Sequence, residues 1–173
     1  MPRRIAITGP ESTGKSELAQ QLAEHYNSSW VPEFARQYLL DLNRDYRLDD
    51  VSFIAENQEK LIHEAFAGSS DYVFADTEML VCTVWADFVF GHIPQAIRLR
   101  LDRQQFDLYL LCYPDLPWEP DPLREHPTQR MELFNIYEAW LKQLNWKYAI
   151  IKGIGSQRLQ NAVDAVNRCF IPV

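Results

Sequence analysis

The sequence Gly9-Pro10-Glu11-Ser12-Thr13-Gly14-Lys15-Ser16 follows the pattern G-x-x-x-x-G-K-S, which is typical of a phosphate-binding P-loop. This motif normally stands between a buried strand and a helix. Residues 3–8 are a short run with strand-forming residues, and residues 16–26 carry Leu18 and Leu22 at helical spacing. Because both flanks agree with the motif, we predict a strand, a phosphate-binding loop and a helix in this order.

Each residue type in this loop has a physical role. Gly9 and Gly14 allow the backbone to turn tightly, so that its N–H groups point at phosphate oxygens. Lys15 would reach the β- and γ-phosphates of ATP, and the Ser16 hydroxyl would bind Mg²⁺. We therefore predict ATP and Mg²⁺ as cofactors and assign the whole loop to ATP binding, namely Gly9, Pro10, Glu11, Ser12, Thr13, Gly14, Lys15 and Ser16.

Strand-like runs and helical patterns alternate along the rest of the chain. Further strands are expected at residues 28–32, 71–76, 106–112 and 147–152, and further helices at residues 34–42, 51–67, 77–90, 97–105, 131–144 and 157–170. Asp49 and Asp50 stand where they can cap the helix that begins near residue 51. The alternation predicts an α/β fold, a three-layer P-loop NTPase fold with a five-stranded parallel sheet and helices on both faces, forming one domain over residues 1–173.

Residues 113–130 interrupt this alternation with a high density of proline. Proline lacks a backbone N–H and clashes within a helix, so neither a regular helix nor a central strand is expected here. We predict a lid-like loop that closes over the phosphates and excludes water, with Arg124 and Arg130 reaching the site. The alternative is that both are surface arginines.

Charged residues stand at the carboxyl ends of the second and third predicted strands, where open α/β sheets bind their ligands. Of Glu33 and Asp76, one would accept a proton from a substrate hydroxyl. The other would hold the metal with Ser16, or bind the sugar of the substrate. Arg36 would contact the transferred phosphate or the substrate. The alternatives are a helix-dipole charge for Glu33, a helix cap for Asp76 and a solvated or intrahelical pair for Arg36.

Aromatic residues cluster after the third predicted strand. Trp85, Phe88 and Phe90, together with Trp30 and Trp118, can line a slot for a flat ring, although core packing is the expected role of most of them. A row of arginines alternates with apolar residues and predicts an exposed helix face. These arginines are Arg98, Arg100 and Arg103.

Composition excludes several classes of function. The net charge of -7 argues against binding to nucleic-acid backbones, which requires clustered positive charge. No run approaches the roughly 18 apolar residues of a membrane helix, and the N-terminus lacks a signal-peptide core. We therefore expect a cytoplasmic protein with a small-molecule substrate, and we leave its oligomeric state open. The histidines match no metal site, and buried reduced thiols are expected at Cys82, Cys112 and Cys169.

Several motifs occur here in a characteristic order. They are the P-loop, Glu-Phe-Ala-Arg at 33–36, Asn-Gln at 57–58, Phe-Ala-Asp-Thr at 74–77, and Trp-Glu-Pro-Asp-Pro-Leu-Arg at 118–124 followed by Gln-Arg at 129–130. In order and spacing they resemble the kinase domain of the NadR family, which joins an adenylyltransferase to a ribosylnicotinamide kinase. The resemblance covers nearly the whole chain.

The resemblance implies ATP- and Mg²⁺-dependent phosphorylation of the 5′-hydroxyl of nicotinamide riboside, which is a step of NAD biosynthesis. It places Lys15 and Ser16 at ATP·Mg²⁺, and Glu33, Arg36 and Asp76 around the acceptor, with Arg124 and Arg130 in a lid. Related nucleoside kinases place a base after the second strand, so Glu33 is the favoured base. Because the chain starts at the P-loop strand, we expect neither an adenylyltransferase domain nor an upstream DNA-binding segment.

Two alternatives stay open at this point. The acceptor can be another nucleoside, a nucleotide or a small alcohol, and the protein can instead be a regulatory P-loop ATPase. A GTPase is disfavoured, because its guanine-reading Asn-Lys-x-Asp element should follow the fourth strand. The chain reads Cys112-Tyr113-Pro114-Asp115 at that place.

Overall fold

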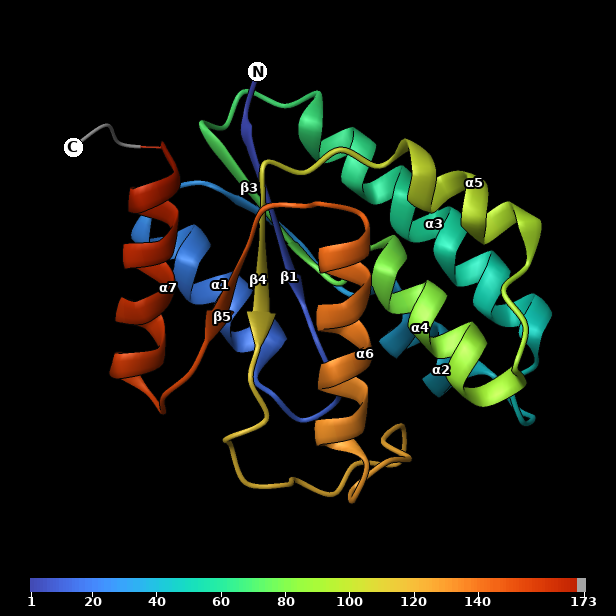
Figure 1. Cartoon of the computed structure of the whole chain (residues 1–173). Helices are drawn as coiled ribbons and strands as arrows, with labels where there is room; N and C mark the ends of the chain where they lie inside the picture. The colour runs from blue at the N-terminus through green and yellow to red at the C-terminus, as the bar shows by residue number, and fades with distance from the viewer. Residues whose placement is uncertain (171–173) are drawn as a thin grey trace.

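The computed structural model describes residues 1–170 and is shown in Figure 1. Strands and helices alternate along the chain, as the sequence predicts. They are β1 (Arg3–Thr8), α1 (Lys15–His25), β2 (Ser29–Val31), α2 (Phe34–Asp41), α3 (Leu48–Phe66), β3 (Tyr72–Asp76), α4 (Met79–Phe90), α5 (Gln95–Arg103), β4 (Leu108–Cys112), α6 (Arg130–Gln143), β5 (Tyr148–Ile151) and α7 (Ser156–Phe170).

The five strands form one parallel sheet in the order β2-β3-β1-β4-β5. The central strand β1 pairs with β3, where Ile7 lies opposite Asp76, and with β4, where Thr8 lies opposite Leu111. Strands β3 and β4 are buried over their whole length, because both faces of a parallel sheet are covered. The predicted five-stranded parallel sheet is confirmed, and the carboxyl ends of its strands meet at one edge.

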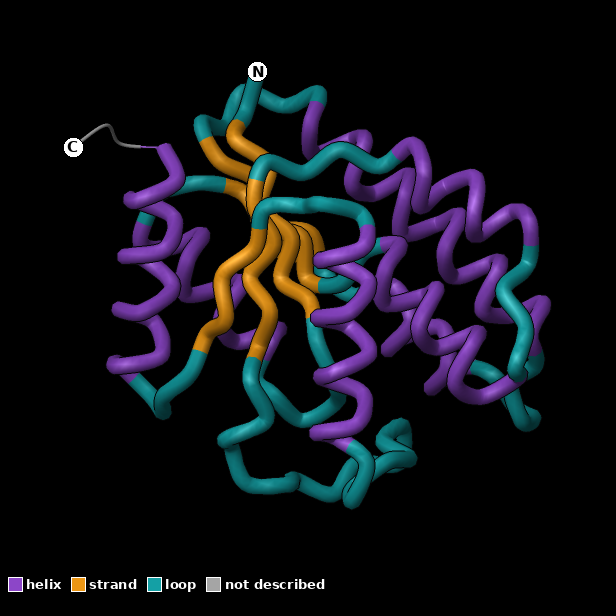
Figure 2. The backbone as a smooth tube through the Cα atoms, in the orientation of Figure 1, coloured by secondary structure: helices purple, strands orange, loops and turns teal. Residues whose placement is uncertain are grey.

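Helices cover both faces of this sheet, as Figures 1 and 2 show. On one face α1 and α7 pack together, and Ile5 of β1 joins a core with Leu18 and Val163. On the other face α4 packs against α3, α5 and α6, and Ala6 of β1 joins a core with Leu80. Successive residues of β1 therefore point into opposite layers, as the two-residue period of a strand requires. The predicted three-layer arrangement is confirmed.

Helix α3 begins three residues before the predicted position, at Leu48. Asp50 lies in its first turn and accepts the backbone N–H of Arg47 at 2.7 Å. It also accepts hydrogen bonds from Tyr38 at 2.6 Å and from the Arg44 guanidinium at 2.7 Å, and these bonds hold its pKa well below the usual range. Asp50 therefore takes part in capping this helix, as predicted, but from its third position, because the helix begins earlier than expected.

The predicted exposed face of α5 is partly wrong. Arg98 and Arg103 are exposed, but Arg100 is largely covered and lies 3.2 Å from Glu59 and 3.7 Å from Glu56 of α3. The cause is the packing of α5 on α3, which turns one arginine of the row toward two carboxylates. The cysteines are free thiols as predicted, buried at Cys82 and Cys112 and partly exposed at Cys169.

The connection from β4 to α6, residues 113–129, contains no helix or strand, in agreement with its proline content. It crosses the sheet edge at which the strands end, below the sheet in Figure 1. None of the helices within residues 1–170 has the length and apolar composition needed to cross a membrane.

Candidate active site

The P-loop has the backbone geometry that its glycines predict. Gly9 and Gly14 have φ values of 129° and 72°, in the region that favours glycine. A Cβ at Gly9 would lie 3.0 Å from the carbonyl oxygen of Cys112, so the loop also needs glycine to approach β4 closely. Gly14 is the N-cap of α1 and provides no side-chain cap, which leaves N–H groups of the first turn available to an anion.

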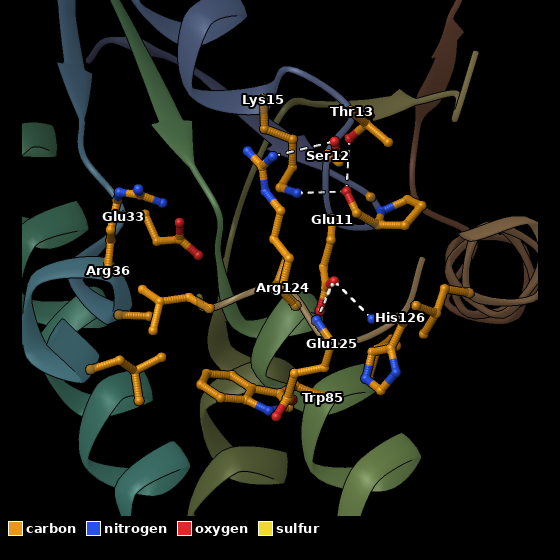
Figure 3. Close-up of a pocket in the computed structure, with 18 of the residues that line it drawn as sticks. Glu11, Ser12, Thr13, Lys15, Glu33, Arg36, Trp85, Arg124, Glu125 and His126 are labelled. Atoms are coloured by element: carbon orange, nitrogen blue, oxygen red, sulfur yellow. Dashed lines mark hydrogen bonds between the residues drawn. The ribbon is translucent and has the colours of Figure 1, made fainter. Parts of the chain in front are cut away.

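Lys15 is folded back on this loop. Its ammonium donates a hydrogen bond to the carbonyl oxygen of Pro10 at 2.8 Å, and the Thr13 hydroxyl donates to the same oxygen at 2.7 Å (Figure 3). A lysine with a single backbone partner is free to exchange it for phosphate oxygens. The loop therefore presents a cation and unpaired backbone donors to one place, as a nucleotide triphosphate requires.

Glu33 stands at the N-cap of α2, directly after β2. Its side chain forms no capping hydrogen bond and points into the cavity (Figure 3). Burial and the negative charge of Asp76 raise the pKa of Glu33 from 4.5 to about 6, although Lys15 and Arg36 oppose the shift. A half-buried carboxylate without a capping role and with a raised pKa is suited to proton transfer.

Asp76 is the last residue of β3 and is 1% exposed. Burial raises its pKa, while the Ser16 hydroxyl and the Lys15 ammonium act in the opposite direction. One carboxylate oxygen, Oδ1, is buried without a hydrogen-bond partner. An unsatisfied buried carboxylate beside a hydroxyl fits a hard divalent cation such as Mg²⁺, which prefers oxygen ligands.

The alternative role of Asp76 as a helix cap is wrong, because Glu78 caps α4 instead. The Glu78 carboxylate accepts the backbone N–H of Leu80 at 2.6 Å, the hydroxyl of Thr8 at 2.9 Å and the amide of Gln104 at 2.7 Å. Glu78 is fully buried, and burial raises its pKa. This capping role was not predicted from the sequence, although a carboxylate two positions after a strand end is a signal for a cap.

Arg36 does not pair with Glu33. Its guanidinium lies 2.8 Å from the carboxylate of Asp121 in the 113–129 connection, and its side chain is 53% exposed. One turn of helix separates Arg36 from Glu33, but Arg36 pairs with Asp121 and forms no ion pair with Glu33. The predicted intrahelical pair is therefore wrong, and Arg36 instead links α2 to the connection that crosses the site.

The 113–129 connection and Arg130 lie against the P-loop. Arg130 donates to the carbonyl oxygens of Ser12 and Leu116, both at 2.9 Å, and Arg124 donates to the Ser12 hydroxyl at 3.4 Å. From the P-loop, the Glu11 carboxylate accepts the N–H groups of residues 125 and 126 at 3.0 and 3.2 Å (Figure 3). The side chains of Glu11 and Ser12 thus contact the connection, which sequence reasoning did not foresee.

A cavity of about 790 Å³ extends from the P-loop into an apolar end. Lys15 and Glu33 line its polar end, and Trp85 lies at the opposite end in Figure 3. The apolar wall comes mainly from α2, α4 and α6, and includes Leu39, Val84, Trp85, Phe88, Phe90 and Tyr137. The α4 aromatics therefore line the cavity, and Trp85 and Phe88 also pack against the core, so both expected roles apply to these two residues.

The two other aromatic candidates lie outside this cavity wall. Trp30 packs on the core beneath α1 and α7, and Trp118 lies against the Arg130 guanidinium, 5.8 Å from ring centroid to carbon. Tyr46, which was not among the aromatic candidates, also lines the cavity. It accepts the indole N–H of Trp85 at 3.2 Å and donates to the Glu125 carboxylate at 2.5 Å.

Arg158 of α7 holds the P-loop by a hydrogen bond to its backbone, a role that was not predicted from the sequence. It is 5% exposed, and its guanidinium lies 2.8 Å from Asp115. It also donates to the carbonyl oxygens of Thr13 at 2.7 Å, Gly153 at 3.0 Å and Tyr113 at 3.1 Å. One buried cation thus ties the P-loop to the carboxyl ends of β4 and β5. No local motif marks it, since its partners Thr13, Tyr113 and Asp115 are distant in sequence.

Comparison with known proteins finds relatives of similar sequence and fold. A family model described as an AAA domain matches residues 4–158. The chain is 28% identical over 156 residues to the trifunctional NAD biosynthesis/regulator protein NadR of Salmonella typhimurium, and 27% identical to that of Escherichia coli. Each match covers 87% of this chain and 38% of the relative, so the chain spans well under half of these proteins.

Solved structures agree with the sequence match. A NadR crystal structure in complex with NR has a TM-score of 0.83 at 22% identity, covering 96% of this chain and 51% of that one. A deoxyadenosine kinase from M. mycoides has a TM-score of 0.67 at 14% identity, covering 95% of this chain and 99% of that one. The predicted three-layer P-loop NTPase fold and the similarity to NadR are confirmed.

Proposed function

The chain belongs to the AAA domain family, and we propose that it is an ATP- and Mg²⁺-dependent kinase that phosphorylates the 5′-hydroxyl of nicotinamide riboside. One observation carries the proposal. Glu33 and Asp76 lie at the ends of adjacent strands, with Lys15 close enough to influence the pKa of both, and Glu33 and Lys15 line a cavity with aromatic walls. A donor site, a candidate base and an acceptor site are thereby combined at one sheet edge.

On the donor side, the P-loop holds the phosphates of ATP. Lys15 leaves the Pro10 carbonyl and binds β- and γ-phosphate oxygens, while the N–H groups at the start of α1 bind the same oxygens. Ser16 and Asp76 are the residues that would hold Mg²⁺, which supplies charge neutralisation of the phosphates when bound. The buried oxygen of Asp76 without a partner supports this role.

On the acceptor side, Glu33 is the general base. Its carboxylate takes the proton of the acceptor 5′-hydroxyl, and the hydroxyl oxygen attacks the γ-phosphorus of ATP. The bond between the γ-phosphorus and the bridging oxygen breaks, so that ADP leaves and nicotinamide mononucleotide forms. Arg36 binds at the acceptor, and Arg124 and Arg130 bind the transferring group from the 113–129 connection, which acts as a lid.

The apolar end of the cavity fits a flat cationic ring. Trp85, Phe88, Phe90 and Tyr46 offer aromatic surfaces, and Asp45 and Glu125 add carboxylates. The neighbouring Arg44 is neutralised by its pair with Asp50. Aromatic faces and nearby carboxylates both favour a pyridinium ring. A NadR protein of the same fold has been solved in complex with NR, which supports the choice of this acceptor.

A panel assay tests the proposal. ADP release is measured with nicotinamide riboside, with other nucleosides and with no acceptor, and the product is identified by mass spectrometry. The 5′-deoxy analogue of nicotinamide riboside is the matched control, because it retains the ring but lacks the reacting hydroxyl. If only another nucleoside stimulates ADP release, the protein is still a nucleoside kinase, but nicotinamide riboside is not its substrate. Steady hydrolysis without any acceptor dependence would instead identify a regulatory ATPase.

A further inference from the structure

We propose that Gln58 of α3 is a positioning residue that fixes Glu33 and Asp76 relative to each other. The inference rests on the proposed kinase function, in which these two carboxylates act as base and metal ligand. Gln58 itself contacts neither donor nor acceptor, because it does not line the cavity. It lies behind the site, between the ends of β2 and β3.

The hydrogen bonds of Gln58 reach both strand ends. Its Oε1 accepts the backbone N–H of Phe34 at 2.8 Å. Its Nε2 lies 3.2 Å from the carbonyl oxygen of Pro32 and 3.4 Å from those of Asp76 and Thr77. The side chain is 1% exposed, so these backbone groups replace water as its partners. An amide with one acceptor oxygen and two N–H donors can serve both strand ends at once.

The need for this amide follows from the sheet. The β2–β3 ladder runs from Ser29 opposite Val73 to Val31 opposite Ala75. Beyond that pair the two chains separate, one into α2 and the other toward α4, and their backbone groups lose their ladder partners. Buried backbone groups without partners are strongly disfavoured. Where the ladder ends, on either side of Glu33 and at Asp76, Gln58 provides the hydrogen bonds that the neighbouring strand no longer provides.

The backbone after Asp76 also depends on such support. Thr77 has a φ of 67°, a left-handed conformation that is unusual for a β-branched residue. Its N–H donates to the carbonyl oxygen of Ile7 at 3.2 Å, and its own carbonyl oxygen faces Gln58. Glu78 is fixed on the other side by Thr8 and Leu80. The strained residue therefore persists because its neighbours hold it, and Gln58 is one of them.

The test replaces Gln58 by methionine, which retains the volume but forms none of these hydrogen bonds. We expect Gln58→Met to lower kcat about 10- to 100-fold, because small displacements of reacting groups are costly. The KM for ATP should stay within about twofold, because the P-loop is anchored separately by Arg158. Gln58→Glu serves as a second variant, since it keeps the acceptor for Phe34 and loses a donor to the carbonyls.

Ile62→Ala is the matched control for stability. Ile62 is a buried residue of the same helix, and its core contacts are Val31, Val73 and Ala75 of β2 and β3. It should lower the Tm as much as Gln58→Met or more, but leave kcat within about twofold. If Gln58→Met lowers only the Tm and leaves kcat unchanged, Gln58 is purely structural and the proposal is wrong.

Hydrogen exchange separates this inference from the kinase proposal. In Gln58→Met the amides of Phe34 and Thr77 should exchange at least tenfold faster, with little change in the rest of the sheet. This measurement needs no turnover. If the wild-type protein phosphorylates no acceptor but exchange is still faster, the proposed function fails and the support of the strand ends by Gln58 stands. Unchanged exchange at both amides would overturn the inference.

Discussion

The charge of Glu33 should make the folded protein less stable at neutral pH, and Glu33→Gln should remove that cost. Burial and the neighbouring Asp76 charge disfavour the ionised carboxylate in the folded state, which raises its pKa from 4.5 to about 6. Glutamine has nearly the same shape and is neutral at every pH. The substitution therefore changes the charge at this position with little change in packing.

The sign and size of the effect follow from proton linkage. Below about pH 4.5 the carboxyl is protonated in both states, so wild type and Glu33→Gln should be equally stable. Between 4.5 and about 6 the unfolded state loses its proton first, and wild-type stability falls as the pH rises. Above that range, at about 1.36 kcal/mol per pKa unit, the full cost is about 2 kcal/mol. We expect Glu33→Gln to raise the Tm at pH 8 by about 4–8 °C.

The assay is thermal and urea unfolding of both proteins at pH 8 and at pH 4.5. Glu24→Gln is the control, because Glu24 is an exposed glutamate of α1 far along the helix from the P-loop, and its loss should leave the pH dependence unchanged. Equal stability of wild type and Glu33→Gln at pH 8 would refute the argument that Glu33 carries an unfavourable charge.

The same variant tests the role of Glu33 in catalysis. A general base contributes about 10²–10⁴-fold, so Glu33→Gln should lower kcat by that factor while it stabilises the fold. In the wild type, kcat/KM should fall as the pH drops through about 6, because the protonated carboxyl cannot accept the proton of the acceptor. If Glu33→Gln retains at least a third of the wild-type kcat, Glu33 is not the general base, and Asp76 is the remaining candidate.

Three further changes test other parts of the site. Lys15→Ala should lower kcat at least 10²-fold in the ADP-release assay, because the phosphates lose a cation; near-wild-type turnover would contradict its role at the phosphates. Arg158→Leu should cost about 3–5 kcal/mol in urea unfolding, because it leaves Asp115 and three carbonyl groups without their shared donor, and a loss below about 1 kcal/mol would refute that account. Arg130→Ala should increase proteolytic cleavage within residues 113–129 several-fold, since both bonds to the Ser12 and Leu116 carbonyls disappear; an unchanged cleavage rate would show that other contacts hold this segment.

Most of the fold was predictable because its signals are local. The P-loop glycines, the strand-like runs and the helical spacing each act over fewer than about 20 residues, so the sheet and its layers could be inferred from the sequence alone. The rule that parallel sheets bind ligands at the carboxyl ends of their strands then located Glu33 and Asp76. The predicted start of α3 was wrong by three residues, because side-chain hydrogen bonds such as that of Asp50 decide where a helix begins.

The missed parts of the site are residues whose role exists only in the folded protein. Arg36 could be placed near Glu33 from its spacing, but its partner Asp121 lies 85 positions away. Arg158 reaches Thr13 across 145 positions, and Gln58 joins backbone groups of two different strands. Backbone carbonyls carry no sequence signature, so even the Asn-Gln motif at 57–58 does not reveal which backbone groups Gln58 binds. The sequence therefore identifies the groups that act on a substrate more readily than the groups that hold them in place. The Asn-Gln motif includes Gln58 without revealing its role, and mutagenesis guided by motifs alone would leave Arg158 untested.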